Sequence, residues 1–161
     1  QAICAANRVE FFGFGASAAV AFDAQHKFFR LQVSAAAYAD PHLQNMSATS
    51  MAPGDVVIAI SQSGRTTTLI NAIERVKSRG ALVIGIAPSG TPVAEAATIP
   101  LTIDAKEDIQ IYTPLSSRIA HLVVIDVLAI GVAKHKGGQL QEHLLELQHG
   151  LEALRSPLKT S

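Results

Sequence analysis

The sequence predicts an α/β fold in which five parallel strands form one sheet and helices cover both faces of that sheet. Five short apolar runs have the length of buried strands, and the segments between the first four are long enough for crossover helices. Turn-forming Gly, Pro and Ser residues follow several of these runs. The expected strands are residues 9–12, 34–38, 56–60, 82–86 and 99–103.

Three helices are expected between the strands. Residues 16–30 have helical length, and residues 66–79 place apolar side chains at helical spacing, with Gly80 suited to the position after the helix end. A shorter helix is expected over residues 41–50, followed by a turn at residues 53–55. This alternation of strands and helices is typical of βαβ units.

The last third of the chain is more apolar. Residues 104–113 show no period and are expected to form a loop, and residues 115–136 form a helix that is apolar on nearly every side. Such a helix is buried under the sheet or in a subunit contact, and Gly137 and Gly138 are expected to end it. A final helix carries leucines at alternating spacings of four and three: Leu140, Leu144, Leu147, Leu151 and Leu154.

These two apolar helices predict a homodimer, because one offers a surface too apolar for water and the other a leucine seam that needs a partner. Packing of both helices within one subunit is the alternative. The length of the chain fits a single domain over residues 1–161.

Composition narrows the possible functions. Lys plus Arg and Asp plus Glu both number 13, so no broad field attracts nucleic acid or an anionic membrane. The one cysteine, Cys4, excludes a disulfide framework and fits a reducing cytosol; a small core residue is the favoured interpretation of it, and a catalytic thiol the other. The apolar stretch 122–133 is broken by Asp126 and is too short to span a bilayer. No signal peptide is expected, so we predict a cytoplasmic protein.

Two strand-to-helix turns are the candidate sites. Residues 13–17 follow the first strand, and residues 61–66 follow the third with three hydroxyls, an amide and a glycine. In an open α/β sheet the carboxyl ends of the strands form the ligand crevice. Helix N-termini there offer unpaired N–H groups that suit a phosphate. Ordinary helix capping by Ser63 or Thr66 would explain one of these hydroxyls but not all of them.

Other sites are less well supported. Gly13, Gly15 and Ala18 also fit the dinucleotide pattern G-x-G-x-x-G/A, with Asp40 placed to hold a ribose, but this leaves the serine-rich turn without a role. The six histidines show no zinc-binding spacing. The sequence therefore predicts no metal and no cofactor.

The two turns together resemble those of the sugar isomerase (SIS) domain. In that family the first turn reads G-x-G-x-S and the second S-x-S-G-x-T, as residues 13–17 and 61–66 do here. The resemblance implies a flavodoxin-like or Rossmann-like three-layer sandwich that binds a phosphosugar, with the phosphate on the second turn and a serine of the first closing over it. The implied ligand-binding residues are Gly15, Ala16, Ser17, Ser61, Gln62, Ser63 and Thr66.

Three further stretches, residues 23–30, 107–118 and 125–129, resemble the effector half of RpiR-type bacterial transcription regulators. Those proteins carry a helix-turn-helix before this domain, and the members most similar to this chain repress hexose and Entner–Doudoroff genes. The resemblance implies that 2-keto-3-deoxy-6-phosphogluconate is the effector and that its binding releases DNA. The 161 residues begin without Met and hold no helix-turn-helix, so we expect DNA binding only through an N-terminal domain absent here.

The family contains both enzymes and sensors. Its isomerases use a glutamate base in the loop before the long helix, and a histidine after the second strand. The nearest carboxylates here are Glu107 and Asp108, and Asn45 and Met46 stand where the histidine is expected. We therefore predict a binding module without catalytic residues, with a phosphosugar aldose–ketose isomerase as the alternative. Candidates for contacts with the sugar, or for plain surface charges, are Glu107, Lys27 and Arg30.

Overall fold

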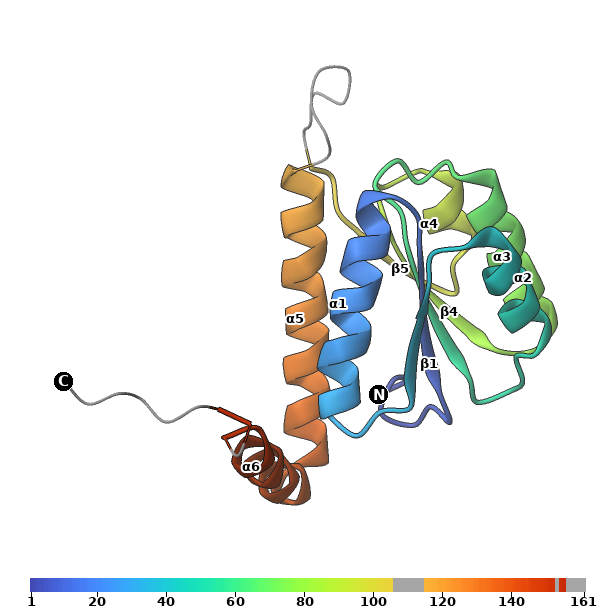
Figure 1. The fold of residues 1–161 in the computed structure, drawn as a ribbon. Coiled ribbons are helices and arrows are strands. Elements are labelled where there is room, and N and C mark those ends of the chain that lie inside the picture. Colours follow the sequence, from blue (N-terminus) through green and yellow to red (C-terminus); the bar gives the residue numbers. More distant parts are fainter. Residues whose placement is uncertain (106–114, 153, 156–161) are drawn as a thin grey trace.

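The computed structural model describes residues 1–105, 115–152 and 154–155. Strands and helices alternate along most of this length (Figure 1). Their order is β1 (Val9–Gly13), α1 (Ala16–Arg30), β2 (Ala35–Tyr38), α2 (Pro41–Thr49), β3 (Val56–Ile60), α3 (Thr67–Ser78), β4 (Leu82–Ala87), α4 (Pro92–Ala96), β5 (Ile99–Thr102), α5 (Ser116–Lys136) and α6 (Gly138–Glu152).

All five strands are parallel and form one sheet in the order β2-β1-β3-β4-β5. Every residue of β1 and β3 is buried, as central strands of a covered sheet require. From β1 the chain crosses to β2 on one side, whereas from β3 it continues to β4 and β5 on the other. The sheet therefore has its topological switch point between β1 and β3, where ligands bind in this class of fold.

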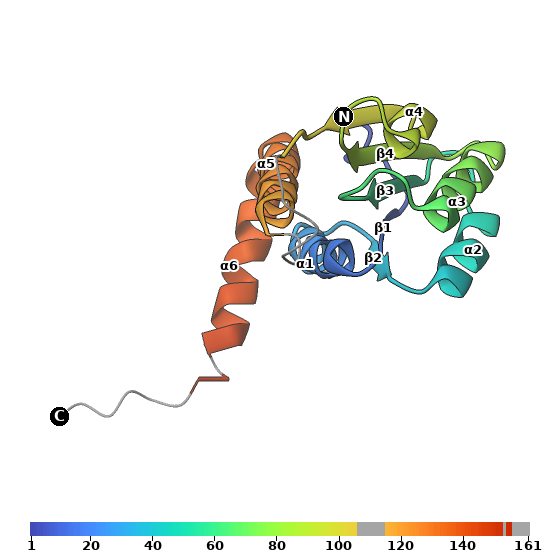
Figure 2. The same ribbon diagram turned by 90° about the horizontal axis from the view of Figure 1, so that it is seen from above.

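Helices form a layer on each face of the sheet. Helices α1 and α5 cover one face, and α2, α3 and α4 cover the other (Figures 1 and 2). Neighbouring side chains of β1 point into opposite layers: Phe11 contacts Phe28 of α1, and Phe12 contacts Tyr38 in the second core. The predicted three-layer parallel sandwich is confirmed.

Helix α5 is buried on one side only. Ile125 and Val132 lie in the core beside α1, whereas the outward face is apolar and more than half exposed. Helix α5 has 21 residues and is therefore longer than the apolar stretch 122–133 identified in the sequence. By length and composition alone α5 could cross a membrane, but the core helices of soluble proteins pass the same test. We call its outward face the α5 stripe; it consists of Ile119, Val123, Val127 and Ile130.

The end of the chain differs from the prediction. Gly137 does cap α5, with φ 65°, but Gly138 already belongs to α6. Leu140 is buried, whereas Leu154 lies beyond the helix and is 82% exposed, so the predicted seam does not extend along one helix face. In Figure 2, α6 leads away from the sheet. The short helix α4 was not predicted at all.

Candidate functional site: a pocket between two strand-to-helix turns

A pocket opens at the carboxyl ends of β1 and β3, at the switch point of the sheet. The turn between β1 and α1 forms one wall, and the turn between β3 and α3 forms the other. Two apolar side chains that the sequence interpretation did not single out, Phe14 and Ile60, complete the lining. The structure thus brings the two predicted turns together around Ala16, Ser17, Ser61, Gln62, Ser63 and Thr66.

The first turn depends on its two glycines for different reasons. A Cβ on Gly13 would lie 2.6 Å from the carbonyl oxygen of Ser17, so only glycine lets α1 start this close to β1. Gly15 has φ 54°, in the left-handed region, and is the residue before α1. Gly15 itself does not line the pocket, whereas Ser17, two residues later in the first turn of α1, does. Ser17 is buried, and among the described residues its hydroxyl has no hydrogen-bond partner.

In the second turn, backbone N–H groups orient the serine hydroxyls. The N–H of Gly64 donates to Ser61 Oγ at 3.0 Å, and the N–H of Arg65 donates to Ser63 Oγ at 3.3 Å. Each of these oxygens is therefore occupied as an acceptor, so its own O–H is left to donate elsewhere. In the part of the chain that the structure describes, neither of these two O–H groups has a protein acceptor, so both can donate to a ligand in the pocket.

Backbone donors add to these hydroxyls. Among the described residues, the N–H groups of Gln62, Ser63 and Thr66 donate to no protein acceptor. Thr66 is the N-cap of α3, yet its side chain makes no capping hydrogen bond, so capping does not account for that hydroxyl. Free N–H groups at the start of a 12-residue helix form a site suited to an anion.

Among the described residues, no charged side chain lines this pocket. Lys27 is on the C-terminal part of α1, about 15 Å along the helix from the pocket at 1.5 Å per residue, and it pairs with Asp23 and Asp126. These carboxylates raise the pKa of the Lys27 ammonium, with Asp126 the larger influence. Arg30 is one turn further on. In this chain the two cations therefore do not join the pocket, and Glu107 lies outside the described residues.

Asp40, which the dinucleotide interpretation places at a ribose, has another role in the structure. Asp40 is the N-cap of α2, where its Oδ1 accepts from the backbone N–H of Leu43 at 2.9 Å. The carboxylate that was to hold a ribose is thus part of a helix cap. As for metals, the described part of the chain contains no group of three or more His, Cys, Asp or Glu side chains that could bind an ion.

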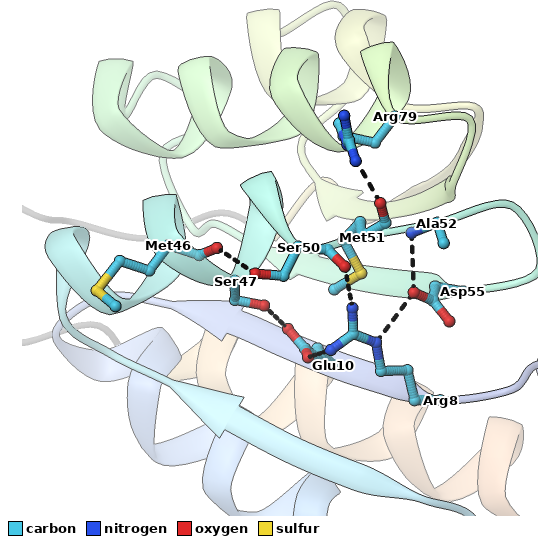
Figure 3. A network of polar contacts seen from close by, with 9 residues as sticks. All are labelled: Arg8, Glu10, Met46, Ser47, Ser50, Met51, Ala52, Asp55 and Arg79. Carbon is cyan, nitrogen blue, oxygen red and sulfur yellow. Dashed lines mark hydrogen bonds and ion pairs between the residues drawn. The ribbon is translucent and has the colours of Figure 1, made fainter.

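A second polar cluster lies at the opposite ends of the same strands (Figure 3). Glu10 of β1 is 3% exposed, accepts from the Ser47 hydroxyl and pairs with Arg8 at 3.2 Å. Burial raises the pKa of the Glu10 carboxyl, against the opposing effects of Ser47 and Arg8. Arg8 also binds Asp55 at 3.0 Å and the carbonyl of Ser50 at 2.7 Å. Because protein groups satisfy this cluster and it is remote from the pocket, we interpret it as a structural tie between β1, α2 and the start of β3.

The sequence profile of the SIS domain matches residues 2–131. The chain belongs to the SIS-domain family. This agrees with the resemblance of its two turns, and the match spans the sheet, the pocket and most of α5.

Regulators are among the curated relatives of this SIS domain. It is 44% identical over 153 residues to the HTH-type transcriptional regulator HexR of Pseudomonas aeruginosa, and 42% identical over 150 residues to HexR of Escherichia coli. The alignments cover 95% and 93% of this chain but 54% and 52% of those proteins, so the chain spans about half the length of these relatives. It is also 44% identical over 128 residues to the bifunctional protein glk of Paraburkholderia xenovorans, covering 80% of this chain and 20% of that protein.

Solved structures share the fold. The NanR protein of Vibrio vulnificus, complexed with ManNAc-6P, superposes with a TM-score of 0.87 at 23% identity, covering 97% of this chain and 59% of that one. The sugar isomerase domain of an RpiR transcription factor from Sphaerobacter thermophilus superposes with a TM-score of 0.79 at 21% identity, covering 94% and 82%. These two structures show the shared fold, and the sequence identity to HexR confirms the resemblance to RpiR-family regulators.

Proposed function

We propose that this SIS domain is the effector-sensing part of a cytoplasmic bacterial transcriptional repressor and that it binds a phosphosugar without converting it. The observation that carries the proposal is the set of unpaired donors in the pocket. Free backbone N–H groups and hydroxyls converge at a helix N-terminus, which is the chemistry that a phosphate requires. The similarity to HexR supports the role in transcription.

Of the described residues, no lysine or arginine would hold the phosphate. Hydrogen bonds from Ser17, Ser61 and Ser63 would reach its oxygens, and the N–H groups of Gln62 and Thr66 would complete the cradle. Such bonds to a charged acceptor are stronger than neutral ones. Phe14 and Ile60 line the same space with apolar surface, which lowers the local dielectric and strengthens these bonds.

Binding rather than isomerisation is supported by the pocket's lining. The described residues that surround it include no carboxylate and no histidine, the groups that would move a proton between sugar carbons. The alternative is a phosphosugar aldose–ketose isomerase, for which Glu107 is the candidate base. We expect glucose 6-phosphate, fructose 6-phosphate and arabinose 5-phosphate to be recovered unchanged, as followed by NMR. Turnover above a buffer control that disappears in Glu107→Gln would favour the isomerase.

We infer that the effector is 2-keto-3-deoxy-6-phosphogluconate, by similarity to HexR-type repressors, and that it acts on DNA through an N-terminal domain outside these residues. The domain would work as a homodimer. The α5 stripe supports this, since four large apolar side chains exposed on one helix face form a contiguous apolar patch of the kind that marks subunit contacts.

Titration calorimetry with a panel of ligands tests the proposal. The panel contains 2-keto-3-deoxy-6-phosphogluconate, its dephosphorylated form, N-acetylmannosamine 6-phosphate and NAD. We expect saturable binding of the first compound, weaker binding of other phosphosugars, and none of the dephosphorylated form or of NAD. Binding of NAD alone, or equal binding of the phosphorylated and dephosphorylated sugars, would contradict the proposal.

A further inference from the structure

Gly64 is held from two sides within the second turn. On the pocket side its N–H donates to Ser61 Oγ at 3.0 Å. On the other side its carbonyl accepts from the N–H of Val93, in α4, at 3.0 Å. Gly64 has φ 63°, a left-handed conformation that favours glycine. A Cβ on Gly64 would lie 2.1 Å from Thr91 Oγ1. The side chain of Thr91 thus occupies the space next to Gly64.

Thr91 belongs to the loop between β4 and α4, which packs against the second turn from outside the pocket. Its hydroxyl donates to the carbonyl of Pro88 at 2.7 Å, which closes the loop on itself. The position of this loop therefore determines where Thr91 and Val93 meet Gly64. The sequence interpretation assigned no function to residues 88–93.

One carboxylate anchors this loop to the neighbouring strand. Asp104 follows β5, and its two oxygens accept from the backbone N–H and the hydroxyl of Ser89 at 2.8 and 2.7 Å. These two hydrogen bonds, that from the hydroxyl first, hold the pKa of the Asp104 carboxyl below its ordinary value. The contact joins residues that are 15 apart in the sequence, and both side chains are solvent-exposed.

We propose that Asp104 is a positioning residue of the phosphate pocket: through Ser89 and Thr91 it holds Gly64 where the Gly64 N–H orients the hydroxyl of Ser61. The inference rests on the proposed function, because it assigns this clamp to the same pocket. If the anchor is lost, the loop between β4 and α4 shifts, the bond between Gly64 and Ser61 loosens, and the Ser61 O–H is no longer directed as a donor.

The contact between Asp104 and Ser89 also connects the side of the pocket formed by Gly64 to the carboxyl end of β5. Asp104 lies at the carboxyl end of β5, and the chain continues from there toward α5, which begins at Ser116. The two hydrogen bonds between Ser89 and Asp104 thus link the loop that contains Thr91 to the end of β5, beside the backbone bond from the N–H of Ile103 to the carbonyl of Ala87 at 3.1 Å.

The test uses Asp104→Asn and Ser89→Ala, with Asp40→Asn as the matched control, because Asp40 is also an exposed aspartate that bonds a backbone N–H but does not contact the clamp. Without ligand, the amide resonances of Gly64 and Val93 should move in Asp104→Asn and stay in place in Asp40→Asn. The dissociation constant of 2-keto-3-deoxy-6-phosphogluconate, with inorganic phosphate as a second probe, should rise at least about threefold, within the range typical of positioning contacts.

The double variant Ser89→Ala/Asp104→Asn should be no worse than Asp104→Asn alone, because both changes act on one link. Unmoved Gly64 and Val93 resonances, unchanged affinity in Asp104→Asn, or additive effects in the double variant would each overturn the proposal. Should the unmodified protein bind neither probe, the proposed function fails, and the Gly64 resonance still decides whether Asp104 positions the turn.

Discussion

At the scale of single residues, the serines of the pocket differ in what else they do. Ser17 contributes a hydroxyl that has no partner among the described residues, whereas Ser61 also accepts the N–H of Gly64. The oxygen of Ser61 therefore also helps to shape the turn that contains it.

We therefore expect Ser17→Ala and Ser61→Ala both to weaken phosphosugar binding by roughly 10- to 150-fold, since a hydrogen bond to a charged group is worth about 1.5–3 kcal/mol. Ser61→Ala should in addition lower the melting temperature by several degrees, because an unpaired buried N–H costs about 1–3 kcal/mol and about 1 kcal/mol shifts the melt of a domain this size by roughly 2–4 °C. Calorimetry beside a thermal melt measures both quantities.

Ser78→Ala is the control for this pair, because Ser78 is an exposed serine at the other end of α3 whose hydroxyl donates to the carbonyl of Arg75. It should leave affinity unchanged. If Ser17→Ala bound the phosphosugar as tightly as the unmodified protein, the first turn would have no part in holding phosphate.

Glu10 gives a prediction on pH. Its folded-state pKa is raised above the ordinary 4.5, so the folded protein keeps a proton that the unfolded chain has released. The stabilisation is full below pH 4.5 and is lost as pH rises through the folded-state value. Glu10→Gln removes this loss of stability with rising pH, because the amide does not titrate. The free energy of unfolding of the variant minus that of the unmodified protein, measured with urea, should therefore be more positive at pH 7 than at pH 4.5. A difference that becomes more negative would show that the ion pair with Arg8 outweighs desolvation.

The sequence was informative about the pocket wherever a motif is continuous in the chain. The turns at residues 13–17 and 61–66 each follow a strand and precede a helix, so their position could be predicted. The sequence could not show that Lys27 and Arg30 lie away from the pocket, since the direction of their side chains depends on how α1 packs against α5. The clamp of Asp104 on Ser89 was not predictable either, because it is formed only when β4 and β5 pair.

At the scale of elements, α5 combines a buried and an exposed apolar face. From sequence, burial under the sheet and a subunit contact were both open, and the exposed stripe favours the second. Polar links join α5 to α1 and to the residues directly after it: Lys27 of α1 pairs with Asp126, and Lys136 donates to the carbonyls of Leu31 and Gln32 at 2.8 Å.

Val127→Glu should convert a homodimer to monomers without unfolding them. Val127 is 61% exposed in the single chain, so a charge there costs the subunit little but would be buried in a dimer contact. Light scattering at micromolar concentration measures the mass, and circular dichroism checks the fold. Ser78→Glu, on an exposed part of α3, serves as the control. A monomeric mass for the unmodified protein at that concentration would contradict the dimer.

Element boundaries were predicted well where the apolar pattern extends over the whole element. The bounds of α1 and β3 were expected as observed, and the other strands differ by one residue at an end. Helix α4 was missed because five residues are too few to show a helical period. The leucine seam was overextended because spacing alone cannot tell where α6 ends, and Leu154 lies beyond that end.

At the scale of the whole molecule, the order of strands explains why the pocket is where it is. Crossovers leave β1 and β3 in opposite directions, so their two turns separate and a crevice opens between them. A sensor also needs two states with different affinities for the effector. Since the turns belong to different halves of the sheet, a phosphate bound by both would favour the state in which they are close together.

Whether both turns hold one phosphate can be decided by a single NMR titration. Labelled protein is titrated with 2-keto-3-deoxy-6-phosphogluconate, and separately with its dephosphorylated form, while the backbone amide resonances of Ser17, Gln62, Ser63 and Thr66 are followed. We expect large, saturable shifts at all four amides with the phosphorylated compound only, and a common dissociation constant. Saturable binding that leaves these amides unmoved, or that moves only one of the two turns, would contradict this expectation.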